Sequence, residues 1–372
     1  MKKLQDKKNL YGILTFHKAH NYGALLQAYA LSYTIKKYNE DVFFVDYENE
    51  ILTKGYSLYP TFNKNNPVKY IKEWIHFILD FKRKHKRYSA FSRFIDNYIK
   101  PFSVSKNNGF DVVFLGSDQI WNASYTNGVD PNYYGQGKGL TANKLVSYAA
   151  SMGKLSLNGK DEVEFISLVQ GINMIGVREK YLKDYIEYKT GRDCVVNLDP
   201  TLLLDRLEWE SLSKKFNNDE RYLLVYEMHP HSEMSRIASQ IAESLNLDIK
   251  VLASRTNYKI SKDVITDADP RDFLMYFANA SFILTTSFHG TVFSIINEIP
   301  FYTLCFDNEV DLRSSSLLEL VNLKDRMISG IKSIDSNHDK LHVNFDEASK
   351  ILQEHRRSSI NFITQALGLQ HE

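Results

Sequence analysis

The stretch Ser281-Phe-Ile-Leu-Thr-Thr-Ser-Phe-His-Gly-Thr291 decides how this chain of 372 residues folds, because an apolar strand leads directly into a polar turn and a helix. Phe282, Ile283 and Leu284 form the short apolar run that is typical of a strand buried on both faces. From Gly290 onward the apolar residues follow helical spacing. This succession of strand, turn and helix predicts a parallel sheet covered by helices.

The turn at 287–291 is a candidate anion-binding site. Backbone N–H groups and the positive end of the helix dipole converge at a helix N-terminus, so a phosphate or a carboxylate is the natural occupant. His289 in this turn is placed to donate a hydrogen bond or a proton. We therefore predict binding by Ser287, His289, Gly290 and Thr291. An ordinary helix cap with a histidine packed beneath it is the alternative.

Strand and helix patterns alternate in two sets, which predicts an α/β protein with two doubly wound, Rossmann-like domains that face a cleft. Predicted strands lie at 10–16, 42–47, 111–115, 145–149, 174–177 and 194–198 in the first set, and at 222–227, 249–253, 282–284 and 301–306 in the second. Predicted helices lie at 22–37, 162–172, 232–245, 271–280 and 346–367. Ligands bind outside the carboxyl ends of parallel strands, so the polar loops that follow the strands are the candidate sites.

The boundary between the two sets is expected at 203–207. The N-terminal domain would then comprise residues 1–205 with a basic helical insert at about 67–100, and the C-terminal domain residues 206–340. The tail 341–372 forms a helix that is expected to cross back to the N-terminal domain.

Composition excludes several classes of protein. The formal net charge of +1 argues against nucleic acid as a partner. Hydrophobic residues at 43% and charged residues at 24% are typical of soluble globular proteins, and no apolar run approaches the ~18 residues of a membrane span. Without a visible export signal we expect cytoplasmic localisation, and Cys194 and Cys305, both in apolar runs, suit buried reduced thiols better than a disulfide or a metal site.

Local charge is high in the segment 69–87, where lysines and arginines alternate with apolar residues. Helical spacing places Ile71, Ile75, Ile78 and Phe81 on one face. A basic amphipathic helix of this kind can lie on an anionic membrane surface, which would make the protein peripheral at the inner face of the membrane. A solvated helix that covers part of the core is the alternative.

The loops after the predicted strands carry the other candidate residues. The first loop is poor in glycine and matches neither a dinucleotide fingerprint nor a phosphate loop, so an NAD site or an ordinary ATPase site is not supported. Asn21 and Gly23 suit a turn that exposes backbone to a ligand, and Gln27 lies one helical turn further on. Helix capping alone also explains Asn21.

Asp118 follows the strand 111–115 and is either a cap or a catalytic base, with a pKa that burial beside Trp121 would raise. The next loop, around Ser147 and Ser151, is rich in small residues and hydroxyls. Arg178 follows the strand 174–177. An anionic substrate is one interpretation of this guanidinium, and an ion pair with Glu179 or Asp199 is the other.

Together these loops resemble the successive motifs of the polysaccharide pyruvyl transferases in order and spacing. The matching segments are His20-Asn21-Tyr22-Gly23-Ala24 with Gln27, Gly116-Ser117-Asp118-Gln119-Ile120-Trp121-Asn122, Ser147-Tyr148-Ala149-Ala150-Ser151, Val177-Arg178-Glu179, Asp199-Pro200-Thr201 and Ser287-Phe288-His289-Gly290-Thr291. The resemblance spans residues 10–306 and implies a fold similar to that of GT-B glycosyltransferases.

Members of that family move the enolpyruvyl unit of phosphoenolpyruvate to two hydroxyls of a sugar and so form a pyruvate ketal. The resemblance implies no metal and no further cofactor. It implies that the C-terminal domain holds the donor, with His289 on the phosphate and available as the acid. Arg178 would then pair with the donor anion, and Asp118 would be the base on the acceptor side in the N-terminal domain.

The same resemblance extends to residues expected to bind substrate. These are His20, Asn21, Tyr22, Gly23, Gln27, Ser117, Gln119, Trp121, Asn122, Ser147, Ser151, Ser287, Gly290 and Thr291. Many family members carry an arginine two residues before the histidine, where this chain has Ser287. Arg255 or Lys259 is expected to compensate for that difference.

Two rival functions remain compatible with the sequence. One is a GT-B glycosyltransferase that uses a nucleotide sugar, because the same fold serves both activities. The other is a non-catalytic, anion-binding subunit of a polysaccharide assembly complex. For the transferase, the expected acceptor is galactose or another hexose in a lipid-linked oligosaccharide, in the synthesis of capsule, exopolysaccharide or lipopolysaccharide.

Overall fold

The structure, a computed structural model, describes residues 9–39, 41–60, 67–99, 103–104, 109–137, 139–154, 157–216, 220–253, 260–261, 263–333 and 341–369. The chain divides into two compact units, each built around one parallel sheet. Unit 1 comprises Met1–Tyr56, Ile95–Leu203 and His355–Glu372, and unit 2 comprises Ser57–Phe94 and Leu204–Glu354. The predicted α/β class with two Rossmann-like domains is confirmed.

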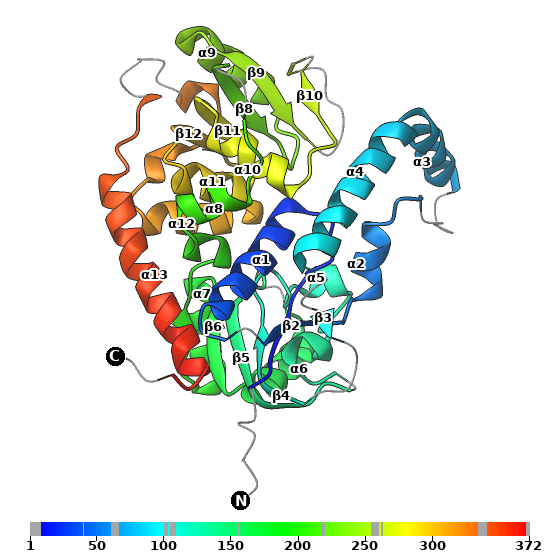
Figure 1. Cartoon of the computed structure of the whole chain (residues 1–372), viewed down its shortest axis with the longest axis vertical. Helices are drawn as coiled ribbons and strands as arrows, with labels where there is room; N and C mark the ends of the chain where they lie inside the picture. Colours follow the sequence, from blue (N-terminus) through cyan, green and yellow to red (C-terminus); the bar gives the residue numbers. More distant parts are fainter. Residues whose placement is uncertain are drawn as a thin grey trace, which may run out of the picture. The chain divides into compact units, whose positions relative to one another are not determined.

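The sheet of unit 1 has seven strands in the order β3-β2-β1-β4-β5-β6-β7, of which β2 to β6 are labelled in Figure 1. The strands are β1 (Tyr11–Leu14), β2 (Val42–Val45), β3 (Ser103–Val104), β4 (Phe110–Leu115), β5 (Ala142–Ala150), β6 (Met174–Val177) and β7 (Cys194–Val196). The helices of unit 1 are α1 (Tyr22–Lys36), α2 (Glu50–Gly55), α5 (Ala123–Thr126), α6 (Gly159–Gln170), α7 (Lys180–Thr190) and the C-terminal part of α13 (Asp346–Ala366). The strand order reverses between β1 and β4, so the loops after these two strands meet at a topological switch point.

Unit 2 has a six-stranded parallel sheet in the order β10-β9-β8-β11-β12-β13. The strands are β8 (Tyr222–Tyr226), β9 (Asp248–Leu252), β10 (Val264–Ile265), β11 (Phe282–Thr285), β12 (Phe301–Leu304) and β13 (Met327–Ile328). The helices are α3 (Pro67–Leu79), α4 (Phe81–Phe94), α8 (Arg206–Leu212), α9 (Met234–Leu245), α10 (Pro270–Ala278), α11 (Phe288–Ile296) and α12 (Leu312–Leu320). Here the order reverses between β8 and β11, and the loop after β11 leads into the predicted anion-binding turn at 287–291.

Both sheets are buried on two faces, as continuous apolar strands require. All four residues of β11 are buried, and all five residues of β8 are buried beside it. In unit 1, the last five residues of β5 are buried, and Trp121 stacks on Tyr134 at 5.2 Å in the adjoining core. Short apolar runs in the sequence therefore form the central strands, and the polar residues that follow them lie at the carboxyl edge.

The basic insert differs from the expectation in two respects. The predicted single helix is divided at Asp80 into α3 and α4, so Phe81 begins a new helix instead of continuing the face of Ile71 and Ile75. The segment Ser57–Phe94 also groups with unit 2 rather than with the N-terminal domain. Contacts from α4 explain this grouping: Lys86 forms an ion pair with Asp267, and Arg87 donates to the carbonyl of Thr266 at 3.4 Å.

The tail helix α13, red in Figure 1, belongs to both units. From His355 onward it groups with unit 1. There the Arg356 guanidinium donates to the Leu202 carbonyl at 2.8 Å, and the Ser359 hydroxyl accepts a hydrogen bond from the Leu198 amide at 3.0 Å. Tertiary contacts therefore anchor the end of the chain in the unit that contains its beginning.

No helix in the described part of the chain is both long enough and apolar enough to cross a membrane. The two cysteines are free thiols, as expected. Cys194 is buried, whereas Cys305 follows the end of β12 and is only half-buried, so the prediction of burial is wrong for Cys305.

His17, just after β1, is a buried titratable group in unit 1. Its ring stacks on Phe44 at 5.0 Å, and Nδ1 lies 3.0 Å from the Thr15 carbonyl. Burial lowers the pKa of His17 from 6.5 to about 4. The unfolded chain therefore takes up a proton at this residue between pH 6.5 and pH 4 that the folded chain does not take up.

We expect His17 to make the protein less stable as the pH falls through this window. Since one pKa unit corresponds to ~1.4 kcal/mol, the free energy of unfolding should decrease by about 3 kcal/mol between pH 7 and pH 4 because of this residue. His17→Gln keeps a hydrogen-bond donor but does not titrate. Between pH 7 and pH 4 the unfolding free energy of this variant should therefore decrease by about 3 kcal/mol less than that of the unmodified chain. Urea unfolding at both pH values measures the difference, and equal pH dependence of the two proteins would contradict it.

Candidate functional site

The loops at the switch point of unit 1 are fixed by buried hydrogen bonds. Thr15, after β1, donates through its hydroxyl to the Ser117 carbonyl at 2.8 Å, which ties the loop after β1 to the loop after β4. The amide of Gln27 donates to the Thr15 hydroxyl and to the Ala24 carbonyl, both at 2.9 Å. Gln27 is fully buried, so its side chain supports the loop from beneath.

Some residues of the first loop stabilise the start of α1, and others are partly exposed to solvent. Asn21 is the N-cap of α1, and its side-chain oxygen accepts a hydrogen bond from the Ala24 amide at 3.2 Å. Tyr22 and Gly23 are buried in the first turn, whereas His20 and Asn21 are partly exposed. Capping, the alternative named for Asn21, is therefore observed, and His20 is the most accessible imidazole of this loop.

Arg178, directly after β6, lies at the centre of a buried charge cluster. Its guanidinium forms an ion pair with Asp199 at 2.8 Å, donates to the Ser117 hydroxyl at 2.5 Å and lies 3.9 Å from the Asp118 carboxylate. Burial alone would lower the pKa of Arg178, but Asp199, Asp118 and Glu179 outweigh it and raise the pKa. The ion pair with Asp199 is the second interpretation given for this residue above.

The remaining acids of this cluster are fixed in different ways. Asp199 has a fully buried side chain and also accepts hydrogen bonds from the amide and the hydroxyl of Thr201. Glu179 accepts a hydrogen bond from the Ser151 hydroxyl at 2.6 Å. Asp118 differs from both, because part of its side chain is exposed and one carboxylate oxygen accepts from the Gln119 amide at 2.9 Å. Asp118 is thus the carboxylate of the cluster with access to solvent.

Tyr56 is a residue near Asp118 that the sequence did not single out. Burial, with a smaller contribution from the Asp118 charge, raises the pKa of the Tyr56 phenol to about 12. It comes directly after α2, in a segment without a recognisable motif. The phenol is therefore protonated at neutral pH, and it is close enough to Asp118 to respond to the charge of that carboxylate.

Several other residues expected to bind substrate serve the packing of unit 1. Trp121 is buried and donates from its indole N–H to the Tyr133 carbonyl at 3.2 Å. Ser147 is buried within β5 and accepts from the Gly176 amide at 3.0 Å. Gln119 accepts through its side chain from the Asn122 side chain at 2.6 Å. Gly116 allows this loop to approach β5, since a Cβ there would lie 2.3 Å from the Tyr148 carbonyl oxygen.

We expect Arg178→Met to destabilise the protein by ~3–5 kcal/mol, because it leaves buried carboxylates without their counter-charge. Arg206→Met provides the control: Arg206 pairs with Glu210 on an exposed helix surface, and its loss should cost less than ~1 kcal/mol. The free energy of unfolding in urea measures both changes. An unchanged stability for Arg178→Met would contradict the structural role of this ion pair.

In unit 2 the switch point is formed by the loops after β8 and β11. The Thr285 hydroxyl donates to the Tyr226 carbonyl at 2.9 Å and accepts from the Ser287 amide at 3.0 Å. Gly290 is required at this place, since a Cβ there would lie 2.2 Å from the Thr285 hydroxyl oxygen. The Thr291 hydroxyl is hydrogen-bonded to the Ser287 carbonyl and to Thr303. The turn is thus held rigidly against the end of the sheet.

The N-terminus of α11 differs from those of its neighbours. Helices α8 and α10 are capped by Asp205 and Asp269, each in a capping box with a second acid. Helix α11 starts after Ser287, whose side chain makes no capping hydrogen bond, and its first turn contains no acidic residue. His289 lies in that first turn and is 7% exposed. The first turn of α11 therefore contains no carboxylate of its own.

Two further histidines follow β8 at the same switch point. The Thr286 hydroxyl accepts hydrogen bonds from the amides of Met228 and His229, at 3.0 and 3.3 Å, which joins their loop to the start of α11. His231 accepts at Nδ1 from the Glu233 amide at 3.2 Å, so a neutral His231 carries its proton on Nε2. Neither histidine was among the residues predicted from the sequence, although His-Pro-His one residue after a predicted strand was the available signal.

Arg313, near the start of α12, adds a cation to this region. Its guanidinium lies 5.3 Å from the centre of the Phe288 ring, and that ring lies 5.1 Å from the ring of His289. The first turn of α11 therefore has an arginine beside it. Arg255 and Lys259, expected to compensate for Ser287, lie outside the described residues.

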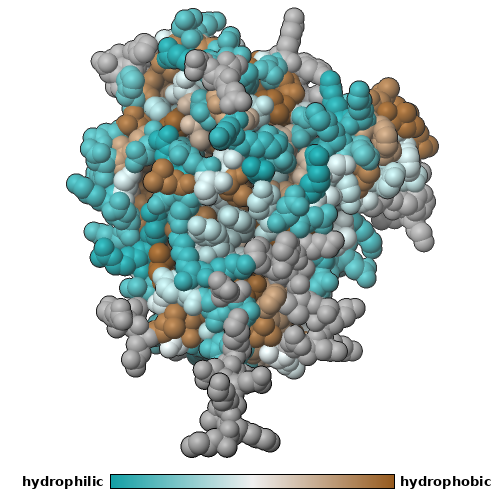
Figure 2. Space-filling view, viewed as in Figure 1, coloured by the Kyte–Doolittle hydropathy of each residue, from teal (hydrophilic) through white to brown (hydrophobic). Residues whose placement is uncertain are grey.

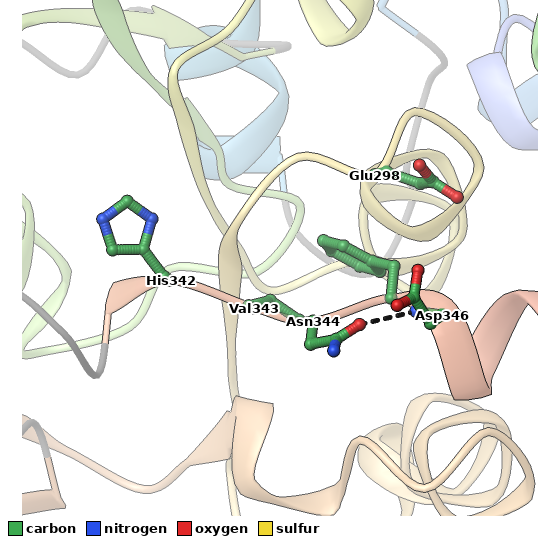
Figure 3. Close-up of a pocket in the computed structure, with 6 residues that line it drawn as sticks. Glu298, His342, Val343, Asn344 and Asp346 are labelled. Atoms are coloured by element: carbon green, nitrogen blue, oxygen red, sulfur yellow. Dashed lines mark hydrogen bonds between the residues drawn. The ribbon is translucent and has the colours of Figure 1, made fainter.

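Unit 2 also contains an open hollow of about 680 Å³, lined by Glu298, His342, Val343, Asn344, Phe345 and Asp346. Figure 3 shows the hydrogen bond between the Asp346 amide and the Asn344 side chain, at 2.8 Å. The Glu298 carboxylate accepts from the Ser349 hydroxyl. None of the predicted site residues lines the hollow, and its two carboxylates would repel an anionic donor. Within the described ranges, no group of three or more histidine, cysteine or acidic side chains is arranged to hold a metal ion.

Comparison with known proteins identifies the family of the chain. Residues 21–308 match the family described as polysaccharide pyruvyl transferase, a range that includes the loops after β4, β8 and β11 and begins at the last residue of the loop after β1. The chain belongs to the polysaccharide pyruvyl transferase family. No curated protein matches the chain.

Solved structures show similarity of fold at low sequence identity. A UDP-N-acetylglucosamine 2-epimerase is similar over 98% of both chains, with a TM-score of 0.53 and 14% identity. The UDP-GlcNAc 2-epimerase from Neisseria meningitidis bound to UDP-GlcNAc has a TM-score of 0.48 and 12% identity over 97% of this chain and 99% of that chain. The O-GlcNAc transferase of Thermobaculum terrenum has a TM-score of 0.40 and 10% identity over 96% and 64%. The first of these supports a two-domain fold of the GT-B type.

Proposed function

We propose that this family member transfers the enolpyruvyl unit of phosphoenolpyruvate to two hydroxyls of a sugar and forms a pyruvate ketal. The sugar is a galactose or another hexose in a lipid-linked oligosaccharide, which is an intermediate of capsular polysaccharide, exopolysaccharide or lipopolysaccharide. The observation that carries this proposal lies at the switch point of unit 2, where the first turn of α11 carries His289, has Arg313 beside it, and is joined through Thr286 to the loop that contains His229 and His231.

This cluster suits a small donor with two anionic groups, a phosphate and a carboxylate. The first turn of α11 offers backbone N–H groups, and His289 can donate a hydrogen bond to the phosphate or a proton to the enol carbon. Arg313 supplies the positive charge that many family members place two residues before the histidine, where this chain has Ser287. A guanidinium suits a phosphate or a carboxylate because it can donate two parallel hydrogen bonds.

The reaction balances without a redox partner or a metal. Carbon 3 of phosphoenolpyruvate takes a proton and becomes a methyl group, while one sugar oxygen bonds to carbon 2. Phosphate then leaves with the electrons of its bond to carbon 2, and the second sugar oxygen takes its place. Of the two hydroxyl protons released, one balances the proton gained by carbon 3 and the other leaves with phosphate. In unit 1 we assign Asp118 as the base that accepts a hydroxyl proton, with the Tyr56 phenol as a neighbouring donor.

Arg178 has a different role in this proposal. It is committed to Asp199 and Ser117 beneath the surface, so it positions Asp118 rather than binding the donor. The sequence-based prediction, in which Arg178 pairs with the donor anion, is the alternative to this role.

Purified protein should release phosphate from phosphoenolpyruvate when a galactose-terminated lipid-linked acceptor is present, with a ketal mass gain on the sugar. His289→Gln should lower the turnover number by ~10²–10⁴-fold, because glutamine can donate a hydrogen bond but cannot transfer a proton. Far-ultraviolet circular dichroism checks that the variant folds. Transfer of a hexose from UDP-sugars instead would favour the glycosyltransferase, and absence of turnover with any hexose acceptor would favour the non-catalytic subunit.

Arg313→Gln should raise the KM for phosphoenolpyruvate by ~10–100-fold, as expected for the loss of a charge-assisted hydrogen bond of ~1.5–3 kcal/mol. Arg236→Gln is the matched control, because Arg236 lies on the exposed side of α9 and pairs there with Glu233. Steady-state kinetics with varied donor concentration measure both variants. If the two variants had the same KM, Arg313 would not belong to the donor site.

A further inference from the structure

Helix α3 presents an apolar stripe to solvent. The stripe consists of Ile71, Ile75, Ile78 and Leu79, with exposed fractions of 59%, 52%, 68% and 77%. The first three residues follow the spacing i, i+4, i+7, so they lie on one side of the helix. Figure 2 shows this surface as hydrophobic at the upper right of the view.

The stripe is not the side through which α3 packs against its own unit. That role belongs to an aromatic side of the helix, where Phe77 is buried and its ring contacts the rings of Tyr59, Trp74 and Phe81 at 5.3–5.5 Å. Helix α3 therefore carries apolar residues on two sides, and only the aromatic side is covered. Large exposed apolar patches usually mark a surface that binds a partner.

Positive charge surrounds the stripe. Lys72 is exposed next to Ile71, and Lys82, Arg83 and Lys84 are exposed in the first turn of α4, which begins two residues after Leu79. These four cations outnumber the two acids of the same stretch, Glu73 and Asp80. The first turn of α4 contains no acidic residue. Cations in a first turn oppose the helix dipole, so helix stability does not account for these three residues.

The spacing of the cations along α4 also indicates that helix stability does not account for them. Lys82 and Lys86 are four residues apart, as are Arg83 and Arg87, and like charges at this spacing destabilise a helix. Lys86 and Arg87 face Asp267 and the Thr266 carbonyl of their own unit. The three cations of the first turn are exposed at the other end of this segment, where the Lys84 ammonium lies 5.6 Å from the centre of the Phe77 ring.

We propose that α3 and the first turn of α4 bind the surface of an anionic phospholipid bilayer. The stripe enters the interface between headgroups and acyl chains, and the four cations contact lipid phosphates. The positive charge favours an anionic lipid surface over a second copy of the chain, because two copies would bring the same cations against each other. The inference does not depend on the activity, but with the proposed function it would place the enzyme where a lipid-linked acceptor lies.

Co-sedimentation with vesicles tests the proposal. The full chain should bind vesicles that contain phosphatidylglycerol and should bind pure phosphatidylcholine vesicles at least about tenfold more weakly, since each cation near an anionic surface adds to binding. K82E/R83E/K84E and I71S/I75S/I78S should each lower the partition coefficient by at least about tenfold, the first through charge and the second through lost apolar contact.

Two control variants match these changes elsewhere on the surface. K160E/K215E/K350E alters net charge by the same amount at exposed lysines outside α3 and α4, and V163S/L207S removes exposed apolar side chains. Both controls should bind like the unmodified chain. The proposal is overturned if that chain does not bind anionic vesicles, if it binds neutral vesicles equally well, or if the test variants bind as well as the controls.

Sedimentation velocity tests whether a second copy of the chain, rather than lipid, covers the stripe. If I71S/I75S/I78S converts an oligomer to a monomer and leaves vesicle binding unchanged, the stripe is an interface between copies of the chain and the lipid proposal is wrong. Because neither assay involves turnover, a failure here is distinguishable from a failure of the proposed activity.

Discussion

The buried ion pair between Arg178 and Asp199 is the constraint on which the site of unit 1 depends. These residues follow β6 and β7, and the same guanidinium reaches Ser117 and Asp118 after β4. One side chain thus joins the carboxyl ends of three strands. Because two charges removed from water are stable only when they are paired, these loops have little freedom to move independently. The same contacts hold Asp118 rigidly. A base that takes a proton from a sugar hydroxyl must keep one geometry relative to that oxygen, so the rigidity suits the proposed role.

The two units place their candidate residues by the same rule but with different chemistry. In each sheet the strand order reverses once, and the polar loops gather at that reversal. Unit 1 fills its switch point with carboxylates around one buried cation, so the exposed charge there is negative. Unit 2 leaves a helix N-terminus uncapped and adds histidines and Arg313, which favours an anion. A proton acceptor and an anion site are the two requirements of the proposed transfer.

The sequence predicted the central strands well because their apolar runs are buried on both faces, as β8 and β11 show. It missed the two-residue strands β3, β10 and β13, since two residues leave no period to recognise. Among site residues, His289 and Asp118 were identifiable because each directly follows such a run. The roles of Gln27, Trp121 and Ser147 in packing depend on neighbours distant in sequence, and Arg313 reaches the first turn of α11 only through the fold.

The division of α13 between the units has a consequence for the order in which the protein is made. Unit 1 contains β1 and also the helix residues from His355 onward, which are synthesised after all of unit 2. The contacts of Arg356 with Leu202 and of Ser359 with Leu198 cannot form until these helix residues have left the ribosome. Unit 1 is therefore completed only after unit 2 has been synthesised, and until then its sheet lacks part of its covering helix.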